Sequence, residues 1–140
     1  MYDTRVADGG RLSLSDPALG SSVLSVRFHA KHSHLLLLGG DAGTVCVWDI
    51  RSNAKCVAPV HTGGVFAAAT LSDAPRSVFT VGGDGWLRQV EVEDGPSVRV
   101  HARLEDHLPL CAVTAFMEPD HRSVTVVAGG DSGTVHTITL

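Results

Sequence analysis

Three histidines, His29, His32 and His34, are the residues whose type and spacing most directly suggest chemistry in this sequence. Neutral imidazoles bind zinc and copper, so the cluster could hold a metal ion. No cysteine or carboxylate lies at a matching short spacing, and one short loop rarely supplies a closed tetrahedral site. We therefore interpret the three histidines as part of a polar surface loop, and we predict no metal site and no cofactor.

Three aspartates, Asp41, Asp84 and Asp131, recur roughly 45 residues apart and could form a catalytic or calcium-binding set. Each of them directly follows a Gly-Gly pair. Glycine and aspartate are favoured in tight turns, because both tolerate the backbone conformations that such turns need. We interpret the three aspartates as hairpin-turn residues, one in each of three equivalent hairpins.

Motifs for catalysis are absent from the sequence, which contains no GxxxxGK[ST] loop, no GxGxxG before a helix and no GxSxG elbow. None of the three cysteines, Cys46, Cys56 and Cys111, stands in a recognisable catalytic pairing with a histidine. The sequence therefore predicts no enzyme and no catalytic residue. A low and odd cysteine count indicates a reducing, intracellular compartment, either cytoplasmic or nuclear.

The composition of the 140 residues, with 44% hydrophobic and 19% charged residues, is typical of a chain with a packed core. The net charge of −4 gives no basic footprint for nucleic acid. The longest apolar runs are far shorter than the roughly 20 residues that cross a bilayer, so no membrane insertion is expected. Other proteins remain as the expected partners.

The elements that must position these residues are short strands. Three segments, 39–50, 82–92 and 129–140, each begin with a Gly-Gly-Asp turn. An apolar run precedes each turn and an alternating run follows it, which is typical of a β-hairpin. A further strand and a loop precede each hairpin, and a more polar fourth strand separates the units, near Arg11, Lys55 and Ser97. The sequence predicts an all-β fold with about three four-stranded antiparallel sheets and no helix.

Phe28-His29 at a loop entry and the dipeptide Trp48-Asp49 at a strand end make nearly the whole chain resemble the WD40-repeat β-propeller family. The resemblance implies that residues 1–140 form part of a propeller, with blades at approximately 1–60, 61–106 and 107–140. It says little about function, because unrelated functions share this fold.

The resemblance also implies a hydrogen-bonded tetrad of His, Ser or Thr, Asp and Trp in a blade, a network that satisfies buried polar groups. No unit has all four, because Val90 and Ile138 replace the Trp in two units, and Leu38 and Ala42 stand at the Ser/Thr and Asp positions in the first. We therefore expect the blades to depend more on apolar packing. The tetrad-like residues are His61, Thr80 and Asp84 in the middle unit, Trp48 in the first, and His107 and Ser132 in the third.

Three blades cannot close a ring, because propellers have about four to eight. Residues 2–5 resemble the Trp48–Arg51 strand end, and the sequence stops after a third strand. We expect an incomplete ring that corresponds to the C-terminal repeats of a larger propeller. Missing upstream sequence or another chain, including a second copy, would complete it.

Loops on a stiff frame are where binding concentrates, so the leading hypothesis is a non-catalytic scaffold for protein–protein interaction in a multi-subunit complex. Trp86 is a candidate anchor, because aromatic residues are enriched at binding hot spots. The alternative is a substrate receptor of a cullin-type ubiquitin ligase. The resemblance implies docking through a W-D-x-R motif, here Trp48, Asp49 and Arg51.

Overall fold

The computed structural model describes residues 13, 15–92 and 98–140. The all-β prediction is confirmed within these residues, which form three antiparallel sheets and one short 3-10 turn, η1 (Pro17–Leu19). Sheet 1 contains β1 (Val23–Phe28), β2 (Leu35–Gly40), β3 (Thr44–Asp49) and β4 (Ala54–Pro59). Sheet 2 contains β5 (Val65–Thr70), β6 (Ser77–Gly82), β7 (Trp86–Val92) and β8 (Val98–Glu105). Sheet 3 contains β9 (Leu110–Met117), β10 (Val124–Gly130) and β11 (Val135–Thr139).

Sheet 3 differs from the predicted four-stranded sheet, because its described residues form only three strands. In sheets 1 and 2 the third strand pairs with a fourth along its whole length, β3 with β4 and β7 with β8. The corresponding edge of β11 has no strand beside it in the described part of the chain. The strand expected near Arg11 and the Tyr2–Arg5 segment both lie outside the described residues.

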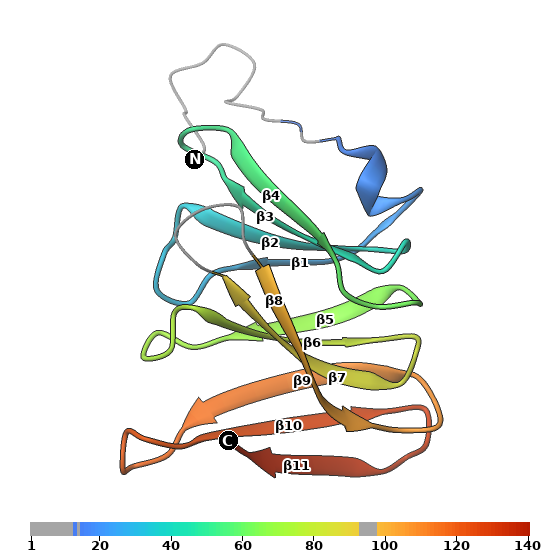
Figure 1. Cartoon of the computed structure of the whole chain (residues 1–140), viewed down its shortest axis with the longest axis vertical. Helices are drawn as coiled ribbons and strands as arrows, with labels where there is room; N and C mark the ends of the chain where they lie inside the picture. The colour runs from blue at the N-terminus through green and yellow to red at the C-terminus, as the bar shows by residue number, and fades with distance from the viewer. Residues whose placement is uncertain (1–12, 14, 93–97) are drawn as a thin grey trace.

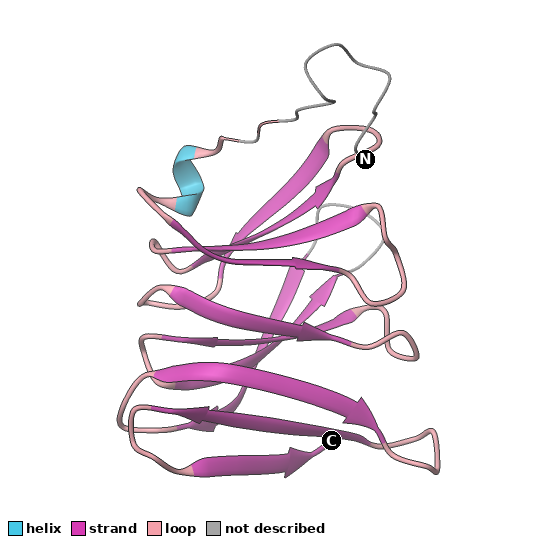
Figure 2. Cartoon of the chain, turned by 180° about the vertical axis from the view of Figure 1, so that it is seen from behind, coloured by secondary structure: helices cyan, strands magenta, loops and turns pink. Residues whose placement is uncertain are grey.

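The three sheets are stacked in chain order, with sheet 1 and sheet 3 at opposite ends of the stack and sheet 2 between them (Figure 1). The first strand of each later sheet packs on the first two strands of the sheet before it: β5 contacts β1 and β2, and β9 contacts β5 and β6. The β2–β3, β6–β7 and β10–β11 turns lie together at one side of the stack, here called the hairpin end (Figure 1). The β1–β2, β5–β6 and β9–β10 loops lie at the opposite side, the loop end (Figure 2).

Alternation along the strands builds the core, because successive side chains of a strand point to opposite faces of its sheet. One apolar cluster lies between sheets 1 and 2 and a second lies between sheets 2 and 3, so sheet 2 is covered on both faces. The first cluster contains Leu37, Val45, Val47, Val60, Val65, Val78 and Val90. The second contains Ala69, Phe79, Val81, Leu87, Leu110, Val126 and Ala128.

The turns at the hairpin end show that the three aspartates are not equivalent. Each turn closes with a hydrogen bond from the N–H of its fourth residue to the carbonyl of its first. Asp41 and Asp131 are the second residues of their turns, whereas Asp84 is the third residue of its turn, directly before a glycine. This position directs Asp84 to a different set of partners. The closing bonds are Gly43 to Gly40, Gly85 to Gly82 and Gly133 to Gly130.

The glycines that end these turns give a matched pair of substitutions. Gly43 has φ +84°, and a Cβ there would lie 1.9 Å from the carbonyl oxygen of His61. Gly133 has φ +72°, with nothing within 4 Å of the corresponding position. Gly133→Ala should lower the free energy of unfolding by about 1 kcal/mol, the cost of a left-handed alanine. Gly43→Ala should lower it by about 3 kcal/mol, because the methyl group also displaces the β4–β5 connection. Equal losses in urea unfolding would contradict this account.

Candidate functional site

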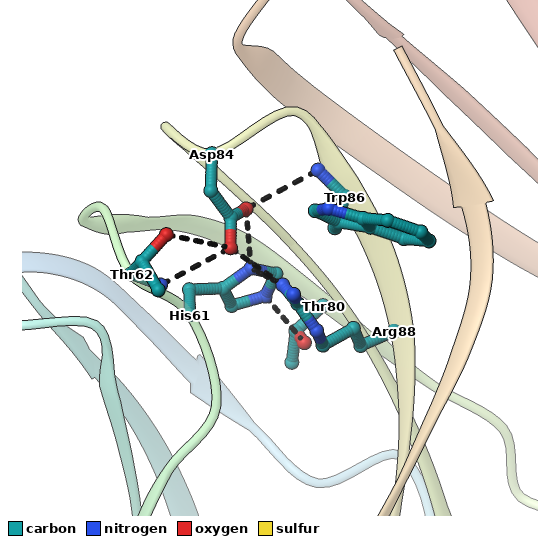
Figure 3. A network of polar contacts seen from close by, with 6 residues as sticks. All are labelled: His61, Thr62, Thr80, Asp84, Trp86 and Arg88. Carbon is teal, nitrogen blue, oxygen red and sulfur yellow. Dashed lines mark hydrogen bonds and ion pairs between the residues drawn. The ribbon is translucent and has the colours of Figure 1, made fainter.

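A buried polar network lies at the hairpin end of sheet 2 and joins the β4–β5 connection to the β6–β7 hairpin (Figure 3). His61 lies in the connection, and its Nδ1 is 2.8 Å from Asp84 Oδ1 in the turn. Its other ring nitrogen, Nε2, is 3.0 Å from the hydroxyl of Thr80 on β6. Arg88 on β7 donates to Asp84 Oδ2 at 2.6 Å. The backbone N–H groups of Thr62 and Trp86 also donate to Asp84.

The charges in this network follow from burial and ion pairing. A carboxylate only accepts and a guanidinium only donates, so Nδ1 of His61, which is 2.8 Å from both Asp84 Oδ1 and Arg88 Nη1, bonds to one or the other according to its tautomer, while the Thr80 hydroxyl can pair with Nε2 in either case. Burial lowers the pKa of His61, and the Arg88 guanidinium, 2.8 Å from Nδ1, lowers it further against the opposing effect of Asp84. Burial alone would raise the pKa of Asp84, but its hydrogen bonds from His61 and Arg88 lower it well below its ordinary value. The network therefore contains a neutral imidazole and an Asp84–Arg88 ion pair.

A second network occupies the equivalent place in sheet 3. Asp106 stands at the position of His61, since the N–H of each donates to the carbonyl of a turn glycine, Gly85 or Gly43. Asp106 accepts from Ser132 Oγ at 2.7 Å and contacts His136 Nε2 at 2.6 Å. These hydrogen bonds lower the pKa of Asp106 well below its ordinary value.

His107 was predicted from the sequence for this network, but its neighbour Asp106 lies there in the structure. The side chain of His107 is 85% exposed and lies 3.2 Å from Asp106. Ser132 does lie in the network, at the turn position that Asp84 holds in the middle hairpin. Sheet 3 thus reverses the arrangement of sheet 2, with the acid in the connection and the histidine on the third strand.

The equivalent positions in sheet 1 are apolar. Leu19 of η1 packs with Leu38 and Cys46 where the other blades have their polar groups, and Ala42 fills the turn position. Trp48 is buried in the same cluster, and its Nε1–H donates to Asn53 Oδ1 at 2.9 Å. Trp48 therefore caps the β3–β4 turn and takes no part in a His-Asp-Ser type of network.

The networks make stability depend on pH. His61, Asp84 and Asp106 all have pKa values below their ordinary ones in the folded chain, so the unfolded chain binds more protons as the pH falls. Their contribution is present at pH 7, starts to decline below about 6.5 as His61 is protonated on unfolding, and falls further below about 4. The free energy of unfolding, measured with urea, should fall steadily as the pH is lowered through this range. In Asp106→Asn it should fall less steeply with pH below pH 4. An identical slope in that variant would contradict the assignment.

The histidine cluster at the loop end is organised as a structural unit. The ring of His29 is buried, its Nε2 donates to the Pro75 carbonyl at 2.7 Å, and its Nδ1 accepts from the N–H groups of Lys31 and His32 at 3.1 Å. Nδ1 of His29 thus holds the β1–β2 loop, and Nε2 joins that loop to the β5–β6 loop. Across the described ranges, no three His, Cys, Asp or Glu side chains lie close enough together to hold a metal ion.

The candidate partner-binding residues lie at opposite sides of the stack. Trp86, half-buried, starts β7 at the hairpin end, and the Arg88 guanidinium lies 5.3 Å from the centre of its ring (Figure 3). Asp49 and Arg51 lie at the loop end, where Asp49 accepts from the Arg51 N–H at 2.9 Å. The side chain of Arg51 is 58% exposed, whereas Trp48 is buried and presents no surface to a partner.

The part of the chain that the structure describes has no helix with the length and apolarity needed to cross a membrane. No protein-family model matches the sequence.

Comparison with known proteins shows similarity to propellers. Topless-related protein 2 of Arabidopsis thaliana is 26% identical over 130 residues, which cover 80% of this chain and 12% of that protein. Its match therefore concerns a small part of a much longer protein.

Solved structures share the fold at low sequence identity. A chain of the Mitotic Checkpoint Complex matches 94% of this chain with a TM-score of 0.68 and 18% identity, over 39% of its own length. The Cps50 (Swd1) beta-propeller domain of Myceliophteria thermophila matches 84% with a TM-score of 0.60 and 15% identity, over 37% of its length. The computationally designed Ika4 protein matches 86% with a TM-score of 0.66 and 18% identity, over 67% of its length.

Proposed function

We propose, from the premise that this chain is a run of WD40-type β-propeller blades, that it is a non-catalytic scaffold for protein–protein interaction in a multi-subunit assembly. The stacked sheets form a stiff frame through two apolar interfaces, and the loops at both sides are available for partners. In the described residues the buried His, Asp, Thr and Arg side chains of the two networks are used to hold connections to hairpins. The polar groups that could do chemistry therefore have structural partners.

The position of Trp86 gives this proposal its most direct support. Its backbone N–H is held by Asp84 and its ring lies near Arg88, so the aromatic surface is fixed before any partner arrives. A rigid aromatic ring beside an arginine is typical of an interface anchor, because neither side chain must be ordered on binding. We expect the hairpin end of sheet 2 to contact a protein partner.

Affinity purification of the tagged chain from its own cells would test this surface. Trp86→Ala should reduce the recovery of specific co-purifying proteins about tenfold, which corresponds to the loss of a hot-spot contact. Leu108→Ala, at another exposed position of the hairpin end, is the control. Unchanged recovery from a folded Trp86→Ala variant would exclude Trp86 as the anchor.

We also propose that further blades complete the ring. Upstream sequence or another chain would supply the remaining blades, and the partners would be proteins, with neither nucleic acid binding nor membrane insertion. The net charge of −4 supports protein partners over nucleic acid. Cys46 and Cys111 are free thiols, which supports an intracellular location, cytoplasmic or nuclear.

Arg51 supports a second candidate function, the substrate receptor of a cullin-type ubiquitin ligase. Its exposed guanidinium beside Asp49 could give a charge-assisted contact to an adaptor carboxylate. Arg122→Ala is a matched control for Arg51→Ala, because each arginine donates its backbone N–H to an aspartate two residues earlier in a loop-end turn. Loss of adaptor co-purification in Arg51→Ala alone would support this function, and equal adaptor recovery in both would exclude it.

A further inference from the structure

The hairpin end and the loop end of the stack differ in charge. The described turns and connections of the hairpin end, residues 40–43, 60–64, 82–85, 106–109 and 130–133, contain aspartates but neither lysine nor arginine. The described loops of the loop end contain Lys31, Arg51, Arg76 and Arg122 beside their acidic residues. A partner that docks at the hairpin end by complementary charge therefore presents cationic groups.

Arg88, on β7 next to the middle turn, does not offset the acidity of the hairpin end, because its charge is already paired. Its Nη1 lies 2.6 Å from Asp84 Oδ2, and the two side chains are 16% and 7% exposed. A largely buried ion pair presents little net charge to an approaching molecule. The charge that a partner meets beside Trp86 therefore comes from another residue.

Glu105 supplies that charge. It is the last residue of β8 and stands directly opposite Trp86, the first residue of β7, in the β7–β8 ladder. Residues opposite each other in an antiparallel ladder point to the same face, with Cβ atoms about 5 Å apart. Glu105 is exposed, and its carboxylate has no hydrogen bond or ion pair with any other described residue. A carboxylate without a cation of its own thus lies beside the indole.

The indole of Trp86 already holds one guanidinium in this structure. Arg88 Cζ lies 5.3 Å from the centre of the ring (Figure 3), within the distance of about 6 Å at which a cation is attracted to an aromatic face. Trp86 is half-buried, so part of its ring stays accessible. Because Asp84 neutralises Arg88, a second cation that approaches the ring is attracted by Glu105 and meets no net opposing charge.

This surface belongs to the middle of the stack. Sheet 2 is covered by sheet 1 on one face and by sheet 3 on the other. Trp86 and Glu105 lie on β7 and β8, the third and fourth strands of sheet 2, whereas β5 and β6 make its main strand contacts with the neighbouring sheets. The accessibility of the two side chains therefore does not depend on what lies beyond sheet 1 or sheet 3.

We propose that the partner of the hairpin end presents an arginine side chain that stacks on Trp86 and forms an ion pair with Glu105. This inference rests on the proposed scaffold function and specifies the chemistry of the partner at the same surface. Arginine fits both groups, because its planar guanidinium stacks on aromatic rings and pairs with a carboxylate through two hydrogen bonds. An acidic partner would be repelled by Glu105, and an apolar partner would cover that carboxylate without pairing it.

The indole N–H signals in nuclear magnetic resonance spectra of the full 140-residue chain test this proposal. The chain has two tryptophans, and Trp48, which is buried and donates to Asn53, is the internal control. The probe is the peptide acetyl-Ser-Gly-Arg-Gly-Ser-amide, with leucine or glutamate in place of arginine for comparison. The arginine peptide should shift the Trp86 signal alone and bind at least about tenfold more tightly than the other two.

Substitutions of Glu105 keep Trp86 as the reporter. Glu105→Gln should weaken binding of the arginine peptide about fivefold, the loss of an exposed ion pair, and Glu105→Lys should weaken it by more than about tenfold through repulsion. Asp73→Lys is the matched control, because Asp73 is an exposed carboxylate at the loop end and its substitution changes the net charge of the chain equally. This control should bind the arginine peptide like the unchanged chain.

Three results would overturn the proposal: equal affinity for the three peptides, no shift of the Trp86 signal, or unchanged binding of the arginine peptide by Glu105→Lys. The scaffold function is tested separately by the recovery of co-purifying proteins with Trp86→Ala. Proteins that are lost with Trp86→Ala but retained with Glu105→Lys would leave the scaffold function standing and overturn the cationic contact. Unchanged recovery with Trp86→Ala would count against the partner surface itself.

Discussion

Replacing Asp84 with alanine should lower the free energy of unfolding by about 4 kcal/mol, because it removes one partner of a buried ion pair. The side chain of Asp84 is 7% exposed and accepts from His61, Arg88 and two backbone N–H groups. Without it, the Arg88 guanidinium loses its ion-pair partner in a site with little access to water. Urea unfolding at pH 7 measures the loss directly.

The matched control for this substitution is Asp131→Ala in the third hairpin. Asp131 is exposed, and its carboxylate accepts only from Cys111 Sγ, at 3.5 Å, among the contacts of the described residues. Its removal should change the free energy of unfolding by less than about 0.5 kcal/mol. A loss of similar size at Asp84 and Asp131 would mean that the turn itself, and not the network, requires the carboxylate.

Sheet 1 shows how the loss at Asp84 can be compensated. The four positions of the network carry Leu19, Leu38, Ala42 and Cys46 there, and they pack without an ion pair. Introducing that apolar set into sheet 2, as His61→Leu, Thr80→Leu and Arg88→Cys in the Asp84→Ala background, should recover part of the lost stability. Buried ion pairs are often replaceable by well-packed apolar groups, whereas half of a pair is not tolerated.

Replacing Phe79 with alanine should lower the free energy of unfolding by a similar amount, about 4 kcal/mol. Phe79 is 1% exposed and lies in the cluster between sheets 2 and 3, where it is the largest fully buried side chain. The cavity cannot collapse easily, because strands on both sides of it are held in their hydrogen-bonded ladders. Urea unfolding of the variant gives the measurement.

Phe66→Ala serves as the control for Phe79→Ala. Phe66 lies on β5 of the same sheet and is 37% exposed, so its truncation removes less buried area and leaves no closed cavity. A loss of at most about 1 kcal/mol is expected. If both variants lost the same free energy of unfolding, the burial of Phe79 between sheets 2 and 3 would not explain its contribution to stability.

The strands and turns were predictable from the sequence because their signals are local. Gly-Gly-Asp between an apolar and an alternating run indicates a hairpin, and three such hairpins appear with the predicted order of strands. The stacking of the sheets followed from the spacing of these hairpins and from the resemblance to known propellers. The apolar character of the network positions in the first blade was also visible, since Leu38 and Ala42 stand there.

The network residues were harder to place, because a shift of one residue in the alignment of the three hairpins changes which side chain is assigned to the network. Asp84 aligns by sequence with Asp41 and Asp131, but the glycine that follows it directly shifts it to the third position of its turn. A count from that glycine would have aligned Asp84 with Ser132. A count back from the first residues of β5 and β9, Val65 and Leu110, would similarly have selected Asp106 over His107.

Trp48 illustrates a limit of short motifs. The Trp-Asp dipeptide pointed to the fold, but it did not show whether the indole would be buried or exposed. Burial under Leu19 and the hydrogen bond to Asn53 depend on η1 and on the β3–β4 turn, two elements that the strand pattern does not specify. Trp48 is buried, so the accessible side chains of that motif are those of Arg51 and Asp49, and the partner-binding role of the motif stays a prediction.

The three different residue sets at the hairpin end have a consequence for folding fidelity. A chain of similar repeats risks joining a connection to the wrong hairpin while it folds. Here a connection carrying Asp106 would place two carboxylates together at the hairpin of Asp84, and one carrying Leu19 would leave the Asp84–Arg88 pair without its imidazole. Each mispairing is unfavourable for a different chemical reason, so divergence between the repeats protects the correct order of assembly.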